Sequence, residues 1–231
     1  MVDGLRRRLR GLLAAPVCLL CAGPSAADLI CSGCRDDLPW NSPACLRCAQ
    51  TLPTPPDRVC GDCLNAPPMF DRAIAALRYQ GAVARAVQQL KYNADFLAAR
   101  WLADALTETI RARRQALPQI LIPVPLHDSR LRRRGFNQAQ ELAKRVGGAL
   151  NVPIEPLWAR RTRSTADQIG LDAAARRRNL RGAFAVDARV ARLDVALLDD
   201  VMTTGSTLNE LARACRRAGA ASVEVWTTAR A

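Results

Sequence analysis

Residues 194–210, DVALLDDVMTTGSTLNE, combine a buried strand, two adjacent carboxylates, a hydroxyl-rich turn and the start of a helix. Residues 195–198 form a short apolar run, which is typical of a strand covered on both faces in a parallel sheet. A tight turn that opens a helix directs free N–H groups and a positive dipole end at one point. The sequence therefore predicts an α/β fold with an anion site, for phosphate, at the carboxyl end of this strand.

Two acids stand between this strand and the turn, and the turn has neither the lysine of GxxxxGK[ST] nor the spacing of GxGxxG. Hydroxyls and bare amides must therefore bind the anion. Residues 197–207 resemble the phosphoribosyl pyrophosphate (PRPP) motif of type I phosphoribosyltransferases. The resemblance implies that Asp199 and Asp200 bind the ribose hydroxyls, and that the 5′-phosphate is bound by Thr203, Thr204, Gly205, Ser206 and Thr207. The alternative is a plain crossover in which the acids only cap and turn the chain.

Eight of the nine cysteines form four CxxC pairs. Two thiolates three positions apart can reach one tetrahedral ion, so eight ligands imply two Cys₄ zinc sites. The simplest pairing is sequential, with one site from Cys18, Cys21, Cys31 and Cys34 and the other from Cys45, Cys48, Cys60 and Cys63. Interleaved pairing stays open, as do disulfides or an iron–sulfur cluster. Cys215 lies on the apolar stripe of the last expected helix, where we expect a small buried side chain.

Composition divides the chain into two expected domains. The 231 residues, of which 49% are hydrophobic, can hold one medium domain and one small one. Few large apolar residues lie between Cys18 and Pro68, so this segment needs metal to fold. We therefore expect a double zinc ribbon domain at 1–68, beginning with a short helix, and a phosphoribosyltransferase-like domain at 69–231.

The net charge of +13 belongs mainly to the second expected domain. Residues 1–68 carry 7 basic and 6 acidic residues, whereas residues 69–231 carry 27 and 15. The arginines gather at 130–134, 160–163 and 176–181, a density that suits the phosphates of PRPP, of pyrophosphate or of a nucleic-acid backbone. Only 4% of residues are aromatic, which weakens a stacking platform for single strands. A solvated basic face is the plainer alternative for any one cluster.

The first twenty residues imitate a signal peptide, with four arginines within residues 6–10 before a short apolar stretch. That stretch contains Pro16 and leads directly into Cys18, so cleavage would destroy a metal site. No segment approaches the ~18 apolar residues of a membrane span. Because metal-binding cysteines must be reduced, we expect a cytoplasmic protein without membrane insertion.

The middle of the chain alternates as α/β proteins do, with a strand at 73–77, helices near 81–92 and 94–115, and a strand at 119–124. The prolines of 123–126 favour a sheet edge or a rigid loop. Asn137 with Gln140 predicts a helix start after a basic loop, residues 130–134, which is a second expected anion site. Residues 159–184 hold seven arginines and two acids, and we expect a mobile, positively charged flap there.

Four separated motifs agree on one family. IPVPL, RRRGFNQAQELA, Gln168 with GLDAAARRRNLRGAF, and LLDDVMTTGST, in this order behind the CxxC pairs, resemble the ComF competence family, in which some members are named GntX. The resemblance covers nearly the whole chain. It implies a type I phosphoribosyltransferase-like parallel sheet flanked by helices behind a double zinc ribbon, and a role in DNA uptake for natural transformation. Most members of the family have no assigned reaction.

The resemblance also implies a chemistry for the pocket. Mg²⁺ would accompany PRPP at Asp199 and Asp200, and a reaction would transfer phosphoribosyl to an acceptor with release of pyrophosphate. The residues expected at the pyrophosphate or in the flap are Pro123, Val124, Pro125, Arg134, Arg163 and Gln168. The only histidine, His127, is expected in a loop beside them. The alternative is a non-catalytic adaptor that senses PRPP and binds single-stranded DNA or DNA-uptake proteins; the acceptor and the oligomeric state stay open.

Overall fold

The computed structural model describes residues 16–26, 28–53, 59–163 and 181–231. The packing divides the chain into two compact units, Met1–Leu38 and Pro39–Ala231. The expected N-terminal helix and Gln168 lie outside the described residues, as does most of the expected flap.

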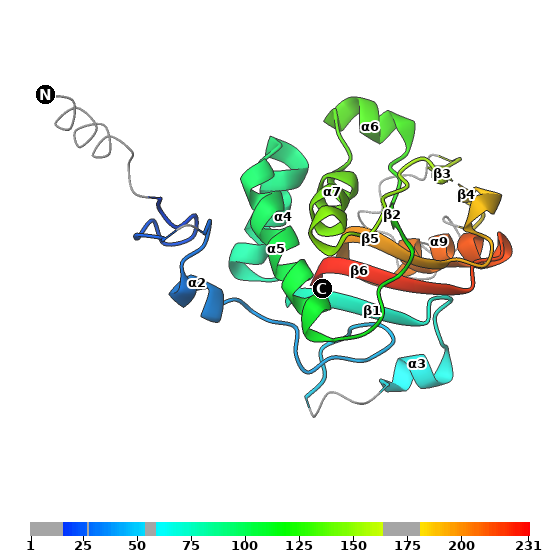
Figure 1. Ribbon diagram of the computed structural model, residues 1–231, viewed down its shortest axis with the longest axis horizontal. Coiled ribbons are helices and arrows are strands. Elements are labelled where there is room, and N and C mark those ends of the chain that lie inside the picture. The colour runs from blue at the N-terminus through cyan, green and yellow to red at the C-terminus, as the bar shows by residue number, and fades with distance from the viewer. Residues whose placement is uncertain (1–15, 27, 54–58, 164–180) are drawn as a thin grey trace, which may run out of the picture. The chain divides into compact units, whose positions relative to one another are not determined.

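The larger unit is built on a four-stranded sheet in the order β1-β6-β5-β2 (Figure 1). All three pairings are parallel, which confirms the predicted α/β sheet. The strands are β1 (Arg72–Arg78), β2 (Ile120–Pro123), β5 (Asp194–Met202) and β6 (Ser222–Arg230). β2 is an edge strand, as expected for a strand that ends in proline, because proline cannot donate a ladder hydrogen bond.

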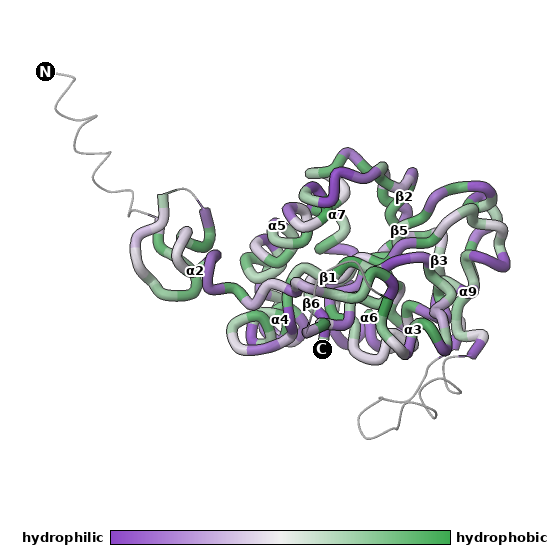
Figure 2. Tube along the Cα trace, turned by 90° about the horizontal axis from the view of Figure 1, so that it is seen from below, coloured by the Kyte–Doolittle hydropathy of each residue, from purple (hydrophilic) through white to green (hydrophobic). Residues whose placement is uncertain are grey.

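Four helices of 12 to 17 residues cover this sheet. α5 (Phe96–Ala112) packs on β1 and β6, while α7 (Gln138–Leu150) packs on β2, β5 and α5. α4 (Gly81–Asn93) packs on α5, and α9 (Ser206–Arg217) packs on β5 and β6. Hydrophobic and hydrophilic segments alternate along α5 and α7 in Figure 2, as expected for helices with one buried face. Because residues 195–198 are fully buried, both faces of β5 are covered.

Helix ends follow from local chemistry. The carboxylate of Asp95 accepts hydrogen bonds from the N–H groups of Leu97 and Ala98 at the start of α5. Asn137 caps α7 through the N–H of Ala139, which confirms the predicted start of that helix.

Cys215 on α9 is fully buried, as predicted, and burial raises the pKa of its thiol to about 12.

The basic segment 130–134 is a helix rather than the expected loop. α6 (Asp128–Arg134) begins at His127, whose Nδ1 accepts a hydrogen bond from the N–H of Ser129, and ends at Gly135 with a φ of 83°. Its last turn holds three arginines, which the negative end of the helix dipole favours. His127 is therefore a helix cap.

The ends of the expected flap are paired with each other. β3 (Ala159–Arg161) and β4 (Phe184–Val186) form a small antiparallel ribbon, and a single 3₁₀ turn, η1 (Ala188–Val190), follows. Glu210 on α9 accepts a hydrogen bond of 2.9 Å from the N–H of Gly182, which fixes one end of this ribbon to the helix.

Residues 39–41 pair with the sheet, which explains why the packing divides the chain after Leu38 rather than at the predicted boundary of 68. The N–H of Asn41 donates to the carbonyl of Ala76 at 2.9 Å, and the N–H of Arg78 donates to the carbonyl of Pro39 at 2.7 Å. Trp40 forms an antiparallel bridge with Leu77. This pairing protects the free edge of β1, and it attaches the second group of cysteines, with α3 (Gly61–Asn65), to the larger unit.

The smaller unit contains the first group of cysteines and the five-residue helix α2 (Ser32–Asp36). Its described residues bury only Cys18, Ser25, Ile30 and Leu38. So small an apolar core agrees with the expectation that metal holds this segment together. Among the described residues, no helix has the length and apolar character needed to cross a membrane.

Candidate functional site

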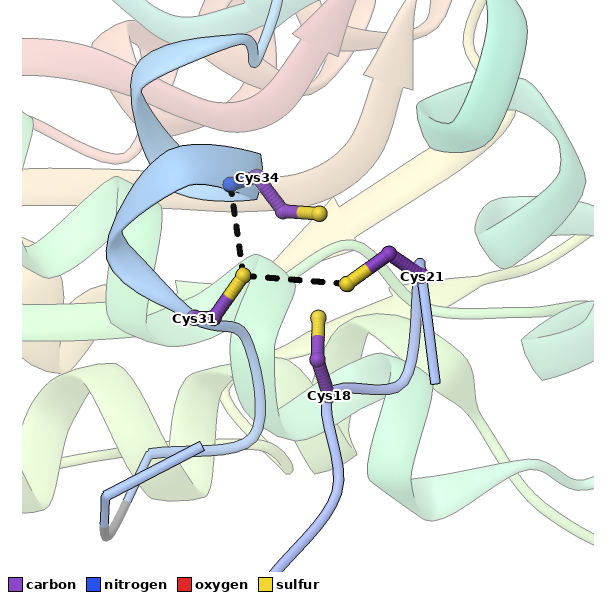
Figure 3. A group of neighbouring side chains, drawn as sticks. All are labelled: Cys18, Cys21, Cys31 and Cys34. Atoms are coloured by element: carbon purple, nitrogen blue, oxygen red, sulfur yellow. Dashed lines mark hydrogen bonds between the residues drawn. The ribbon is translucent and has the colours of Figure 1, made fainter. Parts of the chain in front are cut away.

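Two groups of four cysteines converge, one in each unit. In each group the four sulfur atoms lie within 4.8 Å of one another, and the grouping is the sequential one predicted from the spacing. Figure 3 shows the first group, in which the Sγ atoms of Cys21 and Cys31 are 3.8 Å apart. None of the nine cysteines forms a disulfide.

Backbone hydrogen bonds favour the thiolate form of one cysteine in each group. Although burial opposes it, backbone hydrogen bonds lower the pKa of the Cys18 thiol to about 6 and that of Cys45 to about 7. The N–H of Cys60 donates to the Sγ of Cys45 at 3.3 Å. Four convergent sulfur atoms with no open position form a closed tetrahedral donor set, which fits structural zinc.

The two acids lie in the last part of β5 and point to different environments. Asp200 is 3% exposed, whereas Asp199 is half-buried. The carboxylate of Asp199 accepts a hydrogen bond of 2.9 Å from the N–H of Asp200. Burial, followed by the charge of Asp200, raises the pKa of Asp199 to about 8. Of the two carboxylates, Asp199 is thus the one more open to an incoming ligand.

Lys91 on α4 is a site residue that the sequence motifs do not reveal. Its Nζ lies 2.9 Å from Oδ2 of Asp200. Although burial opposes it, Asp200 and then Asp199 raise the pKa of Lys91, so the ammonium stays charged. Thr228 on β6 donates a hydrogen bond of 2.7 Å to the carbonyl of Asp200 and fixes the backbone at the same point. Asp200 therefore has a buried cationic partner, and Asp199 does not share that contact.

The turn between β5 and α9 has the form of an anion-binding loop. Gly205 has a φ of 71°, in the left-handed region that favours glycine, and it is the N-cap of α9. The hydroxyls of Thr204 and Ser206 lie 2.9 Å apart. The backbone N–H groups of Thr203, Thr204 and Gly205 donate no hydrogen bond to any other residue within the described ranges. Free N–H groups, paired hydroxyls and a helix N-terminus occur together here.

The predicted pyrophosphate residues have different surroundings. Pro123 ends β2 beside Leu198, and the carbonyl of Val124 accepts a hydrogen bond of 3.0 Å from the side chain of Asn137. This bond fixes the start of the loop that contains Pro125. Arg134 binds the side chain of Gln138 and lies over the ring of Tyr92, so its guanidinium already has partners. Arg163 is exposed and donates to the carbonyl of Arg181.

Arg161 on β3 is an arginine that interacts electrostatically with Asp199. Burial and then Arg130 lower its pKa, while Asp199 raises it, so these three charged groups act on one another. Its guanidinium also lies 5.7 Å from the ring centroid of Phe184. The sequence does not set Arg161 apart from Arg160 and Arg163, because only folding shows which side of β3 is buried.

Fold and sites together define a protein in which a double Cys₄ zinc ribbon precedes a parallel α/β unit with an acidic strand end and a phosphate-type turn. A family model described as a double zinc ribbon domain matches residues 9–64, which include all eight paired cysteines. Competence protein F of Haemophilus influenzae is 34% identical over 93% of this chain and 96% of its own length. DNA utilization protein YhgH of Salmonella typhimurium is 37% identical over 95% of this chain and 99% of its own length. The chain belongs to the ComF competence family.

Solved structures show a weaker likeness. A glutamine PRPP amidotransferase from B. subtilis is 20% identical with a TM-score of 0.38, and the match covers 56% of this chain and 26% of that one. A purine phosphoribosyltransferase from Pyrococcus horikoshii is 16% identical with a TM-score of 0.32, over 55% of this chain and 67% of that one. The family assignment rests on the relatives above rather than on these structures.

Proposed function

We propose that the larger unit binds PRPP at the end of β5. The observation that carries this proposal is the turn at 203–207, where free N–H groups, a left-handed glycine and two hydroxyls lie directly after Asp199 and Asp200. The turn would bind the 5′-phosphate, and Asp199 would accept hydrogen bonds from the ribose hydroxyls. Lys91 would hold the buried carboxylate of Asp200 in place through their ion pair.

Mg²⁺ is the cation that we propose to accompany PRPP. It prefers one or two carboxylates together with substrate phosphates, and its charge would displace the proton that the raised pKa of Asp199 favours, leaving a carboxylate without the ammonium contact that Asp200 makes. Bound Mg²⁺ would neutralise charge on the leaving pyrophosphate. Arg161 and Arg130 would add positive charge on the same side as Asp199, and Arg163 or Gln168 stays a prediction for the flap.

If an acceptor enters, the reaction breaks the bond between the anomeric carbon and pyrophosphate and forms a bond from that carbon to the acceptor. Residues 203–207 would hold the sugar phosphate while the acids orient the ribose. The arginines would bind the departing pyrophosphate. Residues that hold both ends of PRPP restrict the reacting geometry, which is the main contribution expected from this chain.

The biological role that we propose is DNA handling in competence, in the cytoplasm. The names of the relatives, competence protein F and DNA utilization protein, support it. The reduced, metal-ready cysteines support the compartment.

A second candidate function is binding of single-stranded DNA, with or without catalysis. Tyr92 is 76% exposed and Phe96 is 51% exposed, close to the arginines of α6. Phe96 and Phe136 meet edge to face at 5.3 Å, and Arg134 lies over Tyr92. Exposed rings beside arginines suit stacking with bases and contact with phosphates, although the chain as a whole has few aromatics.

Calorimetry with PRPP, with and without Mg²⁺, tests the first candidate. We expect Asp199→Asn and Thr204→Val each to weaken PRPP binding about tenfold, because each removes a group that contacts the ligand. Asp104→Asn, an exposed carboxylate on α5, is the matched control and should change nothing. If the wild-type protein does not bind PRPP, the proposal fails. A screen of amine and nucleobase acceptors for pyrophosphate release then separates enzyme from adaptor.

Titration with a single-stranded oligonucleotide tests the second candidate. Phe96→Ala should weaken binding severalfold, whereas Leu97→Ala, at a neighbouring side chain that is 50% exposed, should not. Equal weakening by the two variants would show that stacking of bases on Phe96 does not explain the binding of the oligonucleotide.

A further inference from the structure

Arg230, at the end of β6, touches both the second cysteine group and the phosphate-type turn. On the ribbon side its Nε donates to the carbonyl of Cys48 at 3.2 Å, and Nη2 donates to the side chain of Gln50 at 2.7 Å. On the turn side Nη1 donates to the carbonyls of Met202 at 3.1 Å and Thr203 at 2.5 Å. One guanidinium thus joins a metal-ligand loop to the first residues of the turn.

The bond to the Thr203 carbonyl sets which way the next amide of the turn points, and the Met202 carbonyl is held both by Arg230 and by the N–H of Ala231 at 3.0 Å. In a trans peptide the C=O and the N–H lie in one plane and point in opposite directions. When Arg230 binds the carbonyls of Met202 and Thr203, the N–H groups of Thr203 and Thr204 must point away from Arg230. Those N–H groups are among the ones without a protein partner in the described ranges. Arg230 therefore orients the donors that the 5′-phosphate would use.

The second cysteine group in turn stabilises the cation. The guanidinium of Arg230 is hydrogen-bonded to Cys48, a ligand of this site, so the two charges would lie close together. A zinc ion with four thiolates carries a net charge of about −2, which would strengthen the attraction. A lysine could not replace Arg230 here, because an ammonium group has no planar set of donors that reaches oxygen atoms on two sides at once.

We propose that Arg230 is a positioning residue that couples the second Cys₄ site to the 5′-phosphate turn, so that an ordered second ribbon is required for full affinity toward 5′-phosphorylated ligands. The inference rests on the proposed PRPP site for its ligand, whereas its structural part, the order of the turn, can be measured without any ligand.

The test compares Arg230→Gln with Arg216→Gln in the full-length zinc-loaded protein. Arg216 makes a similar set of contacts at the opposite end of β6, because it binds the carboxylate of Asp71 and the carbonyls of Ala220 and Ala221. We expect Arg230→Gln to weaken binding of PRPP and ribose 5-phosphate about tenfold and to leave Mg²⁺-pyrophosphate binding unchanged. Arg216→Gln should leave all three affinities unchanged.

A milder variant isolates the ribbon side of the contact. Gln50→Ala removes one acceptor of Arg230 and no zinc ligand, so we expect a twofold to threefold loss for ribose 5-phosphate at full zinc content. Hydrogen exchange of the segment 201–209, without ligand, should be faster in Arg230→Gln and unchanged in Arg216→Gln.

The outcomes separate the two proposals. If the wild-type protein binds neither PRPP nor ribose 5-phosphate, the proposed function fails, and exchange in 201–209 still decides the coupling. If PRPP binds but Arg230→Gln changes neither the affinity for ribose 5-phosphate nor the exchange, the coupling is wrong. Equal weakening of pyrophosphate and ribose 5-phosphate would also overturn it, because general loosening of the unit would then explain the loss.

Discussion

The two cysteine groups have the same chemistry and different surroundings. Each brings four sulfur atoms within 4.8 Å. The first belongs to the compact unit Met1–Leu38, whereas the second belongs to Pro39–Ala231, where its flanking residues pair with β1 and its Cys48 carbonyl binds Arg230. Identical ligand sets can therefore serve different purposes. Metal in the first site would stabilise a small segment, and we expect metal in the second also to stabilise the sheet that carries the candidate PRPP site.

The largest expected effect comes from removing a ligand from each site in turn. Cys48→Ser should lower the Tm of the larger unit by more than about 10 °C, because zinc binding supplies folding free energy and the loss also loosens residues 39–41 on β1. Cys31→Ser should leave that transition unchanged. Calorimetry of both variants, with zinc content measured beside it, makes the comparison; equal shifts would show that the two sites are energetically equivalent.

A second prediction concerns the ion pair between Lys91 and Asp200. Lys91→Met leaves the carboxylate of Asp200 buried without its cation, which should cost about 3 kcal/mol or roughly 10 °C in Tm. The double variant Lys91→Met with Asp200→Asn should recover much of the loss, because no buried charge then remains. The loss of Tm caused by Lys91→Met should appear in the same unfolding transition that Cys48→Ser lowers. A shift of a separate transition would mean that the second ribbon and the sheet do not melt together.

The pH dependence of the larger unit gives a third prediction. The pKa of Asp199 rises from 3.8 in the unfolded chain to about 8 in the fold, so the folded state binds more protons between these values. Stability should therefore be highest below about pH 4 with respect to this group, and should fall as the pH rises toward 8. Because Asp199 is half-buried, screening reduces the total to about 1–2 kcal/mol. Asp199→Asn should flatten this part of the profile, and an unchanged slope would assign it to another group.

Much of the site could be predicted from the sequence because its signals are local. The apolar run before Asp199, the turn after it and the spacing of the cysteines each lie within a few residues, and the structure confirms the strand, the turn and the sequential pairing. Lys91 and Arg230 could not be found in this way. Each lies on another element and meets its partners only after folding, and no pattern around either residue sets it apart from other basic residues.

The difference between local sequence signals and contacts that form only on folding also explains where the sequence predictions and the structure differ. The packing of residues 39–41 on β1 is a long-range contact, so composition placed a domain boundary at residue 68, whereas the compact units divide after Leu38. The basic run of α6 is a helix rather than the expected loop. A histidine cap and the helix dipole favour the helix instead.

The smallest expected effect tests the junction between the second ribbon and the sheet at one side chain. Asn41 is 8% exposed; its Nδ2 donates to the carbonyl of Ala49 at 2.9 Å and its Oδ1 accepts from the hydroxyl of Thr51 at 2.7 Å. Asn41→Ala keeps the backbone bond to β1 but leaves the Ala49 carbonyl without this donor, which should cost about 1 kcal/mol, or roughly 3 °C in Tm. The cost stays at the low end because the half-buried Thr51 hydroxyl can turn to water. Asn65→Ala, at an exposed asparagine of α3 in the same ribbon, is the matched control and should shift the Tm by less than about 1 °C. If the two variants behave alike, the hydrogen bonds of the Asn41 side chain contribute nothing to the stability of this junction.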